Sequence, residues 1–369
     1  MKRILLVGEH YSENLGDGIL CQCTDYLIKK YFKSEVLVEY LDLSGRKYFN
    51  KKPNQNNILL KWKNLQYFIL EKIGLMNFYK SYRKKKKVNK LKSNVKNVDY
   101  DVIIIAGGQL IGGNFINKIE RVFEFYPNVV KVFNSVGGNG SIISEKFFSE
   151  DRIKKNNIRG VTFRDSEINL SNIYCDKTFD TAILCNKVFS GGTEAQSEIV
   201  GLGIMKAQNF SEYQQLLFWK KLIKILKYNN KNFKLFTNGD PNDYDFAKKV
   251  LNDNNLNKKF LIDRPIYPHE LIKDIIQFKS IVSFRMHSHV IAYSYGIPSI
   301  AVKWDQKIES FFKKNNYSER IIDICEKETV IYDKLIKAES EKNNLEQLKY
   351  QQQLLEFKFE KLMKSALDN

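Results

Sequence analysis

Short apolar runs alternate with amphipathic stretches along most of this chain. The first run, at 4–7, ends at a glycine and is followed by a turn at 14–18, after which apolar residues recur at helical spacing as far as 31. A short continuous apolar run is typical of a parallel strand that is buried on both faces. The order of strand, glycine-containing turn and helix is how nucleotide-type α/β domains begin.

The alternation forms two series. The first series predicts strands at 36–40, 102–106, 129–136, 160–163 and 181–184. The second series predicts strands at 198–204, 233–237, 281–284 and 299–303, with helices at 212–228, after Pro241 and near 268–278. Two such series predict an α/β protein with two doubly wound, Rossmann-like lobes and a cleft between them. At 369 residues the chain is long enough for two domains.

The expected domain boundaries follow from breaks in this rhythm. We expect an N-terminal lobe over 1–190 and a C-terminal lobe over 191–327, because small and polar residues interrupt the alternation between 186 and 197. A helical, basic insertion occupies about 45–98 of the first lobe. The last segment, 328–369, is predicted to be helical, and one arrangement that we consider is its return onto the N-terminal lobe. The expected apolar face of this segment consists of Leu345, Leu348, Leu355, Phe359, Leu362 and Ala366.

Composition restricts the classes of function. The hydrophobic fraction of 43% excludes disorder over most of the chain. The net charge of +18 favours an anionic partner, such as a nucleic acid, a phosphorylated small molecule or an anionic membrane. The five cysteines include no CxxC pair and no cluster with histidine, so we expect a reducing, cytoplasmic protein without a metal site. The sequence has no run of about 20 apolar residues that would predict a transmembrane helix.

Two glycine-containing turns are candidates for ligand contacts. Asn14, Gly16 and Asp17 precede the first predicted helix, where free backbone amides favour anions. Gly107 and Gly108 follow a buried strand, and glycines at that end of a strand line ligand crevices in open α/β sheets. The alternative in each case is a plain turn, with Asp17 as a helix cap. The GxGxxG fingerprint is absent, so we do not expect bound NAD.

Charged residues follow two of the predicted strands. Arg164 comes directly after 160–163 and is either an anion ligand or half of an ion pair. The strand at 281–284 is followed by Arg285, which can hold phosphate or carboxylate bidentately, and by His287, which can transfer a proton near neutral pH. The alternative is a buried structural histidine beside a surface arginine. Further candidates for substrate binding in this region are His289, Lys303 and Lys307.

The order of these blocks resembles that of the polysaccharide pyruvyl transferase family. The blocks, spread over about 1–315, are Asn14-x-Gly16-Asp17, Gly107-Gly108, Arg164-Asp165, Asp180, Arg285-x-His287, Gly296-x-Pro298 and Asp305-x-Lys307. The resemblance implies two lobes of the GT-B kind and the transfer of pyruvate from phosphoenolpyruvate to a sugar as a cyclic ketal. The sugar would belong to a surface polysaccharide or its lipid-linked precursor. The chain departs from the family pattern at Gln109, after 137–140 and at Thr181, which leaves the exact donor and acceptor open.

The resemblance also implies roles for single residues. Arg285 would clamp the anionic phosphoenolpyruvate, and Arg164 would supply a second anion contact. His287 would protonate C3 of the enol, and Asp17 would act as a base or orient a hydroxyl group of the acceptor. This chemistry requires no metal and no organic cofactor.

Two other functions and one further partner remain open at this point. A GT-B glycosyltransferase with a nucleotide-sugar donor would need a similar anion clamp. A nucleic-acid-binding protein would use the aromatic and lysine residues of 58–92, but the sequence has no recognised nucleic-acid-binding motif, and we expect no nucleic-acid partner. The same segment has eight Lys or Arg residues between 80 and 92, which predicts peripheral contact with the anionic inner face of a membrane.

Overall fold

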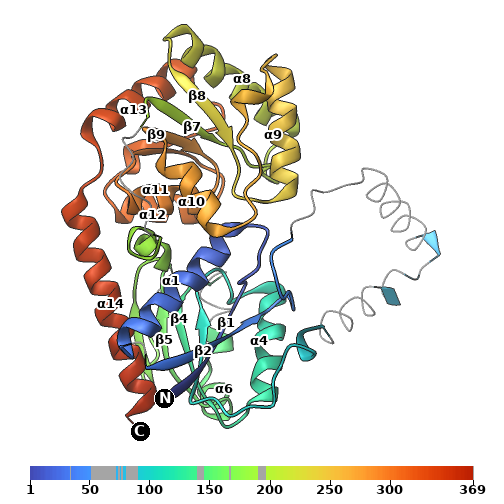
Figure 1. Ribbon diagram of the computed structural model, residues 1–369, viewed down its shortest axis with the longest axis vertical. Helices are drawn as coiled ribbons and strands as arrows, with labels where there is room; N and C mark the ends of the chain where they lie inside the picture. The colour runs from blue at the N-terminus through green and yellow to red at the C-terminus, as the bar shows by residue number, and fades with distance from the viewer. Residues whose placement is uncertain are drawn as a thin grey trace.

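The computed structural model describes residues 1–33, 35–50, 72–73, 75, 78–79, 90–138, 145–165, 168–189 and 197–368. Within these residues the chain forms two separate parallel β-sheets, each packed between helices, and the two lobes lie end to end (Figure 1). The predicted α/β fold with two Rossmann-like lobes and a helical C-terminal segment is therefore confirmed.

The N-terminal sheet has six described strands in the order β2-β1-β3-β4-β5-β6. These strands are β1 (Lys2–Gly8), β2 (Val36–Asp42), β3 (Val102–Ala106), β4 (Val130–Val136), β5 (Ile158–Phe163) and β6 (Tyr174–Lys177). The helices of this lobe are α1 (Leu15–Tyr31), α4 (Gly113–Phe125), α6 (Glu150–Lys155), the 3-10 helix η1 (Thr181–Leu184) and α7 (Cys185–Val188). Every residue of the central strand β3 is buried, as its continuous apolar run predicts.

The C-terminal sheet has five described strands in the order β11-β10-β9-β7-β8. These strands are β7 (Ile199–Gly203), β8 (Asn232–Phe236), β9 (Ser280–Ser283), β10 (Ser299–Val302) and β11 (Ile321–Ile322). The α-helices are α8 (Glu212–Tyr228), α9 (Pro241–Asp253), α10 (Pro268–Ile276), α11 (Met286–Ser294), α12 (Gln306–Lys314), α13 (Glu328–Glu341) and α14 (Leu345–Leu367), and the 3-10 helices are η2 (Lys258–Phe260) and η3 (Ser318–Arg320). Helix α8 begins after a capping box formed by Ser211 and Gln214, which explains its sharp start.

Some local predictions were wrong, and others lie beyond the described residues. The strand expected at 181–184 is the 3-10 helix η1, because the carboxylate of Asp180 accepts a hydrogen bond from the backbone N–H of Ala182 and starts a helical turn. Leu345 does not belong to the buried face of α14, since it lies in the first turn and is 53% exposed. The expected domain boundary falls partly on 190–196, outside the described residues, so its position stays a prediction.

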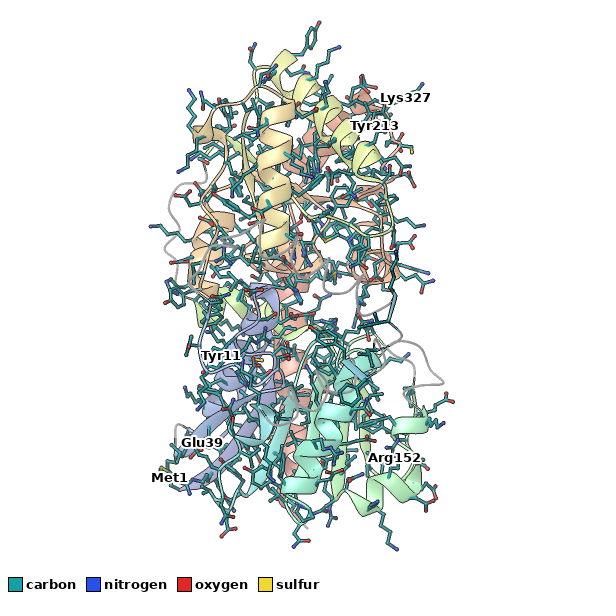
Figure 2. All side chains as sticks on the ribbon, turned by 90° about the vertical axis from the view of Figure 1, so that its right-hand side faces the viewer. Met1, Tyr11, Glu39, Arg152, Tyr213 and Lys327 are labelled. Carbon is teal, nitrogen blue, oxygen red and sulfur yellow. The ribbon has the colours of Figure 1, made fainter. Side chains whose placement is uncertain are left out.

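The carboxyl ends of the strands of both sheets face the junction between the lobes. Figure 2 shows Met1, which precedes β1, at the far end of the N-terminal lobe, and Tyr11, which follows β1, near the junction. From the other lobe, α11 begins just after β9 and contacts Gly16 of α1 through its first turn. The loops that follow the strands therefore meet at the junction, which is where open α/β sheets bind their ligands.

Helix α14 connects the two lobes through neighbouring glutamines. Gln351 donates from Nε2 to Asn315 Oδ1 at 3.0 Å in the C-terminal lobe. Gln352 donates to the carbonyl oxygen of Ile183 at 2.6 Å in the N-terminal lobe. The helix also packs on β4, β5 and β6, so the C-terminal segment returns onto the N-terminal sheet (Figure 1).

The proposed membrane segment at 58–92 lies mostly outside the described residues. Trp62 and Phe68 are among the residues not described, whereas the described Phe78 is 75% exposed. Among the described residues, no helix is both long enough and apolar enough to span a bilayer.

Candidate functional site

The lobe junction brings His287 against Gly16. His287 lies in the first turn of α11, just after the buried strand β9, and is 9% exposed. A Cβ atom on Gly16 would lie 2.2 Å from Nδ1 of His287, so only glycine leaves room for the imidazole at this position of α1. Two motifs that are about 270 positions apart in the chain therefore form one contact across the junction.

Gly16→Ala should lower the free energy of unfolding by about 1–3 kcal/mol, because the added methyl group overpacks the contact with His287. In the double variant Gly16→Ala/His287→Ala the ring is absent, so most of this loss should disappear. Denaturant unfolding of the four proteins of this mutant cycle measures the coupling. If the loss of unfolding free energy in the double variant equals the sum of the losses in the two single variants, the contact between Gly16 and His287 is contradicted.

The environment of His287 contains charges of both signs. Burial lowers the pKa of His287, the carboxylates of Asp180 and Asp17 act in the opposite direction, and the nearby cations of Arg164 and Lys307 favour the neutral ring again. Among the described residues, Nε2 of His287 is buried and has no hydrogen-bond partner. A buried polar atom of this kind is costly unless water or a ligand satisfies it.

The turn before α1 is polar and is joined to the second lobe. Asn14 and Ser12 both donate to Oδ2 of Asp17, at 3.3 Å and 3.1 Å. The N–H of Leu15 donates to the carbonyl oxygen of Asn238, at 2.9 Å, across the junction. In the described part of the chain, Asn14 Oδ1 and Asn238 Nδ2 are further buried atoms without a partner. This turn therefore has hydrogen-bonding capacity that a hydroxyl group can satisfy.

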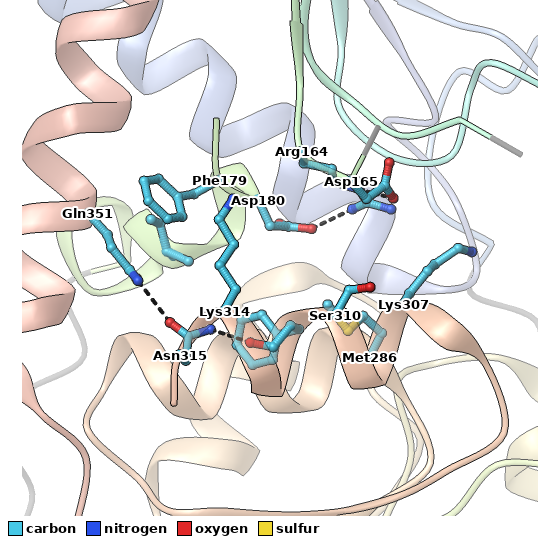
Figure 3. A pocket seen from close by; sticks show the side chains of 12 residues that line it. Arg164, Asp165, Phe179, Asp180, Met286, Lys307, Ser310, Lys314, Asn315 and Gln351 are labelled. Atoms are coloured by element: carbon cyan, nitrogen blue, oxygen red, sulfur yellow. Dashed lines mark hydrogen bonds and ion pairs between the residues drawn. The ribbon is translucent and has the colours of Figure 1, made fainter. Parts of the chain in front are cut away.

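Three cationic side chains line a pocket between the lobes, beside η1 and α12 (Figure 3). They are Arg164, Lys307 and Lys314, and the carboxylates of Asp165 and Asp180 face them. The pocket has a volume of about 60 Å³, which holds a few water molecules or a small anionic group but not a saccharide chain.

The cations of this pocket are held in place by specific contacts. Arg164 donates from Nη1 to Asp180 (Figure 3), and its Nε lies 3.4 Å from Asp165. Burial disfavours the charged form of Arg164, but the two carboxylates outweigh this effect and raise its pKa. Lys307 donates from Nζ to Gln109 of the other lobe. Burial lowers the pKa of Lys314 to about 8.

The predicted glycines shape the loop above this pocket. Gly107 and Gly108 have positive φ angles of 46° and 74°, a region in which side chains are strained. The carbonyl oxygen of Gly108 accepts a hydrogen bond from the N–H of Gly137 at 2.8 Å. A Cβ atom on Gly137 would lie 2.6 Å from Asp165 Oδ2, so this close approach requires glycine. The structure thus shows how these glycines determine the geometry of the loop, and their contact with a substrate stays a prediction.

Arg285 is engaged by carboxylates of its own lobe. Its Nε donates to Asp243 Oδ2 at 2.7 Å, and its Nη2 lies 3.5 Å from Asp240 Oδ2. Asp243 is 2% exposed, and burial raises its pKa, which the positive charge of Arg285 opposes. Arg285 does not line the pocket between the lobes.

Two predicted binding residues lie apart from the pocket. His289 has no exposed surface, and its Nε2 lies 3.0 Å from the carbonyl oxygen of Ser283. Its ring also packs on Phe312. Lys303 is exposed and pairs with Glu309 at 2.8 Å. Neither residue lines the pocket between the lobes. These contacts of His289 and Lys303 join each of them to other residues of the C-terminal lobe.

His289 should make the protein less stable in mild acid. Burial lowers its pKa to about 4, whereas an unfolded histidine titrates near 6.5, so below that pH the unfolded chain binds the proton first. The contribution of His289 to stability is complete above the unfolded pKa and falls by about 2 kcal/mol between pH 7 and pH 5. In His289→Gln, which keeps a donor for the Ser283 carbonyl, this part of the pH dependence should vanish from unfolding curves at the two pH values. If the stability of the variant depends on pH as strongly as that of the unaltered protein, His289 is not the source of this pH dependence.

Several residues of the junction were not among those expected from the sequence. Lys314 lies seven positions after Lys307 on α12, a spacing that puts both on one helix face and that could have indicated it. Gln109 entered only as a departure from the family pattern, yet it is a partner of Lys307. Asn238 follows β8 and carries no distinctive local motif, so only the fold shows its contact with α1.

Comparisons with known proteins agree with this architecture. A family model described as polysaccharide pyruvyl transferase matches residues 14–306. No curated protein matches the chain in sequence. Staphylococcus aureus MnaA, solved with UDP, is similar over 95% of this chain and 90% of its own, with a TM-score of 0.52 and 13% identity. Methanocaldococcus jannaschii UDP-GlcNAc 2-epimerase, solved with UDP-GlcNAc and UDP, is similar over 91% and 92%, with a TM-score of 0.52 and 13% identity. At this identity the structures show the fold alone, which is the GT-B-like arrangement of two lobes.

Proposed function

This chain belongs to the polysaccharide pyruvyl transferase family, and from that premise we propose that it moves pyruvate from phosphoenolpyruvate to a saccharide as a cyclic ketal. The observation that carries the proposal is the buried, unpartnered Nε2 of His287 beside the cations of the junction. A general acid and an anion site are the two elements that this reaction needs in one place.

The donor binds as an anion at the junction. Phosphoenolpyruvate carries about three negative charges near neutral pH, by analogy with other phosphate monoesters. Arg164, Lys307 and Lys314 supply positive charge in a pocket where little water competes. Arg285 does not line this pocket, and its Nε and Nη2 bind Asp243, so in this proposal its Nη1 contacts a part of the donor that extends out of the pocket.

His287 protonates the donor at C3. In the free protein burial favours the neutral ring, and the negative charges of a bound donor raise its pKa so that it takes up a proton. The electron pair of the C2–C3 double bond takes that proton, which leaves an oxocarbenium-like centre at C2. One hydroxyl group of the acceptor adds at C2, and phosphate leaves with its bonding electrons. A second hydroxyl group then adds at C2, gives its proton to the departing phosphate and closes the ketal ring.

The turn at 14–17 orients the acceptor. Asp17 lies one residue after the glycine that contacts His287, and it accepts hydrogen bonds from Ser12 and Asn14. A carboxylate there accepts the proton of an attacking hydroxyl group, and Asn14 Oδ1 accepts a hydrogen bond from a neighbouring one. The reaction as proposed uses no metal and no organic cofactor.

The proposal also places the enzyme at the inner face of the cell membrane. A cytoplasmic enzyme that works on lipid-linked saccharides meets them at the inner membrane face, and the basic residues of 80–92 would attach it there. Liposome cosedimentation tests this part. The protein should pellet only with liposomes that contain anionic lipid, and pelleting should be lost when 84–87 are changed to Gln. Pelleting that is the same without anionic lipid and in the variant would overturn the membrane contact.

Release of inorganic phosphate tests the donor. The enzyme is mixed with phosphoenolpyruvate and a panel of oligosaccharides, and in parallel with nucleotide sugars and the same panel. Acceptor-dependent phosphate release from phosphoenolpyruvate is the expected result. Release of nucleoside diphosphate from a nucleotide sugar, without phosphate from phosphoenolpyruvate, would instead indicate a glycosyltransferase.

A further inference from the structure

A second, larger groove lies on the N-terminal lobe, outside the junction. It is formed by the later turns of α1, the strand β2 and the end of α7, and it has a volume of about 860 Å³. None of its lining residues lines the pocket beside η1, and the proposed reaction gives none of them a role. The groove is therefore separate from the pocket described above.

The groove is basic and only partly neutralised. Four lysines line it, which are Lys29, Lys30, Lys33 and Lys187. Lys29 pairs with Asp25 at 2.6 Å, and Lys30 and Lys187 share Glu356 at 2.8 Å and 3.0 Å. Four positive charges thus face two carboxylates, and the side chains of Lys29 and Lys30 are still 51% exposed. The excess of positive charge favours an anionic ligand.

The other lining residues suit a saccharide. The rings of Tyr26 and Tyr40 line the groove, and Tyr40 is 46% exposed. Aromatic rings offer flat apolar surfaces that can pack on the C–H faces of sugars, and Gln22 adds an amide that can both donate and accept hydrogen bonds. Lysines combined with such groups fit a chain of acidic sugars better than a compact phosphate.

Two segments connect the groove with the pocket between the lobes. The segment 180–189 contributes Asp180 and Ile183 to the pocket and Lys187 to the groove. Asp17 lies in the first turn of helix α1, which carries Lys29 three turns later, about 18 Å along the helix axis. The small pocket leaves a polymeric acceptor outside it, and the groove lies within the reach of such a polymer.

We propose that this groove binds a stretch of acidic saccharide chain that lies several sugar units from the reacting one. The proposal rests on the proposed function in one respect: each ketal adds a carboxylate, so a chain that has already been modified becomes anionic. The groove would then hold modified units while the next unit reacts at His287.

The test measures binding without turnover. The probe is polygalacturonate, a carboxylated polysaccharide, with neutral dextran as the comparison, and no phosphoenolpyruvate is present. The groove variant is Lys29→Gln/Lys33→Gln/Lys187→Gln. The matched control is Lys220→Gln/Lys224→Gln/Lys227→Gln on the exposed face of α8, which removes the same charge elsewhere. Thermal unfolding checks that all three proteins are folded.

The groove variant should bind polygalacturonate about tenfold more weakly than the unaltered protein, as expected for the loss of three exposed ionic contacts. The control variant should bind within about twofold of it, and dextran should not bind. Equal losses in both variants, equal binding of dextran, or no binding by the unaltered protein would each overturn the proposal. So would anionic-vesicle binding that depends on the groove lysines when polygalacturonate binding does not. Because no donor is present, failure of pyruvyl transfer leaves this result unaffected.

Discussion

His287→Ala should lower kcat for pyruvyl transfer by about 10²–10⁴-fold, the usual contribution of a positioned general acid. The reason is that His287 is a titratable group packed against Gly16 and close to the charges of Arg164 and Lys307, and its buried Nε2 has no hydrogen-bond partner among the described residues. The KM for phosphoenolpyruvate should change little, because the cations of the pocket remain. Steady-state kinetics of phosphate release measure both constants.

His287→Gln serves as the control for this variant. Glutamine fills much of the same space and keeps hydrogen bonds, but it does not titrate, so it should be as inactive as the alanine variant while remaining as stable as the unaltered protein. The descending limb of the pH profile of kcat, where the acid loses its proton, should also disappear. A near-normal kcat in His287→Gln would show that His287 is not the general acid.

Arg285→Ala should have the largest effect on stability, about 3 kcal/mol, because it leaves the carboxylate of Asp243 buried without its countercharge. The figure is at the low end for a buried pair, since the Arg285 side chain is 21% exposed. Denaturant unfolding measures the loss.

A second variant separates the two roles of Arg285. In Arg285→Ala/Asp243→Asn the buried charge is removed together with its partner, so much of the stability should return. If Arg285 also clamps the donor, the KM for phosphoenolpyruvate should stay high in this folded double variant. A normal KM there would limit Arg285 to holding Asp243 and would transfer the anion site entirely to Arg164, Lys307 and Lys314.

The fold was predictable from the sequence where local and tertiary signals agree. The helix at 212–228 occurs as predicted, because its capping box and the spacing of its apolar residues specify the same element. The strand expected at 181–184 does not occur, because four apolar residues fit either a strand or a buried helical turn, and Asp180 decides in favour of the turn. Short apolar runs without flanking signals carry this ambiguity.

The structure brings several of the candidate residues together, but the sequence did not indicate which of them would be in contact. Gly16 and His287 were both candidates, but only the fold places the ring against the glycine. Arg285 was expected to face an anionic substrate, and its nearest anion is Asp243, which is 42 positions away in α9. A charged residue at a strand end indicates a partner, and the spacing of residues along the chain does not identify which one.

The most direct test of the account is the reaction in D2O. Protonation of C3 by His287 predicts that the methyl group of each pyruvyl ketal gains at least one deuterium from solvent. Mass spectrometry of the product, after exchange of its hydroxyl groups back to hydrogen, measures it. The expected product is a saccharide whose mass is increased by one pyruvic acid less one water, and further by the mass difference of that deuterium. A pyruvylated product whose methyl group carries no deuterium, or an acceptor left unmodified by phosphoenolpyruvate, would contradict it.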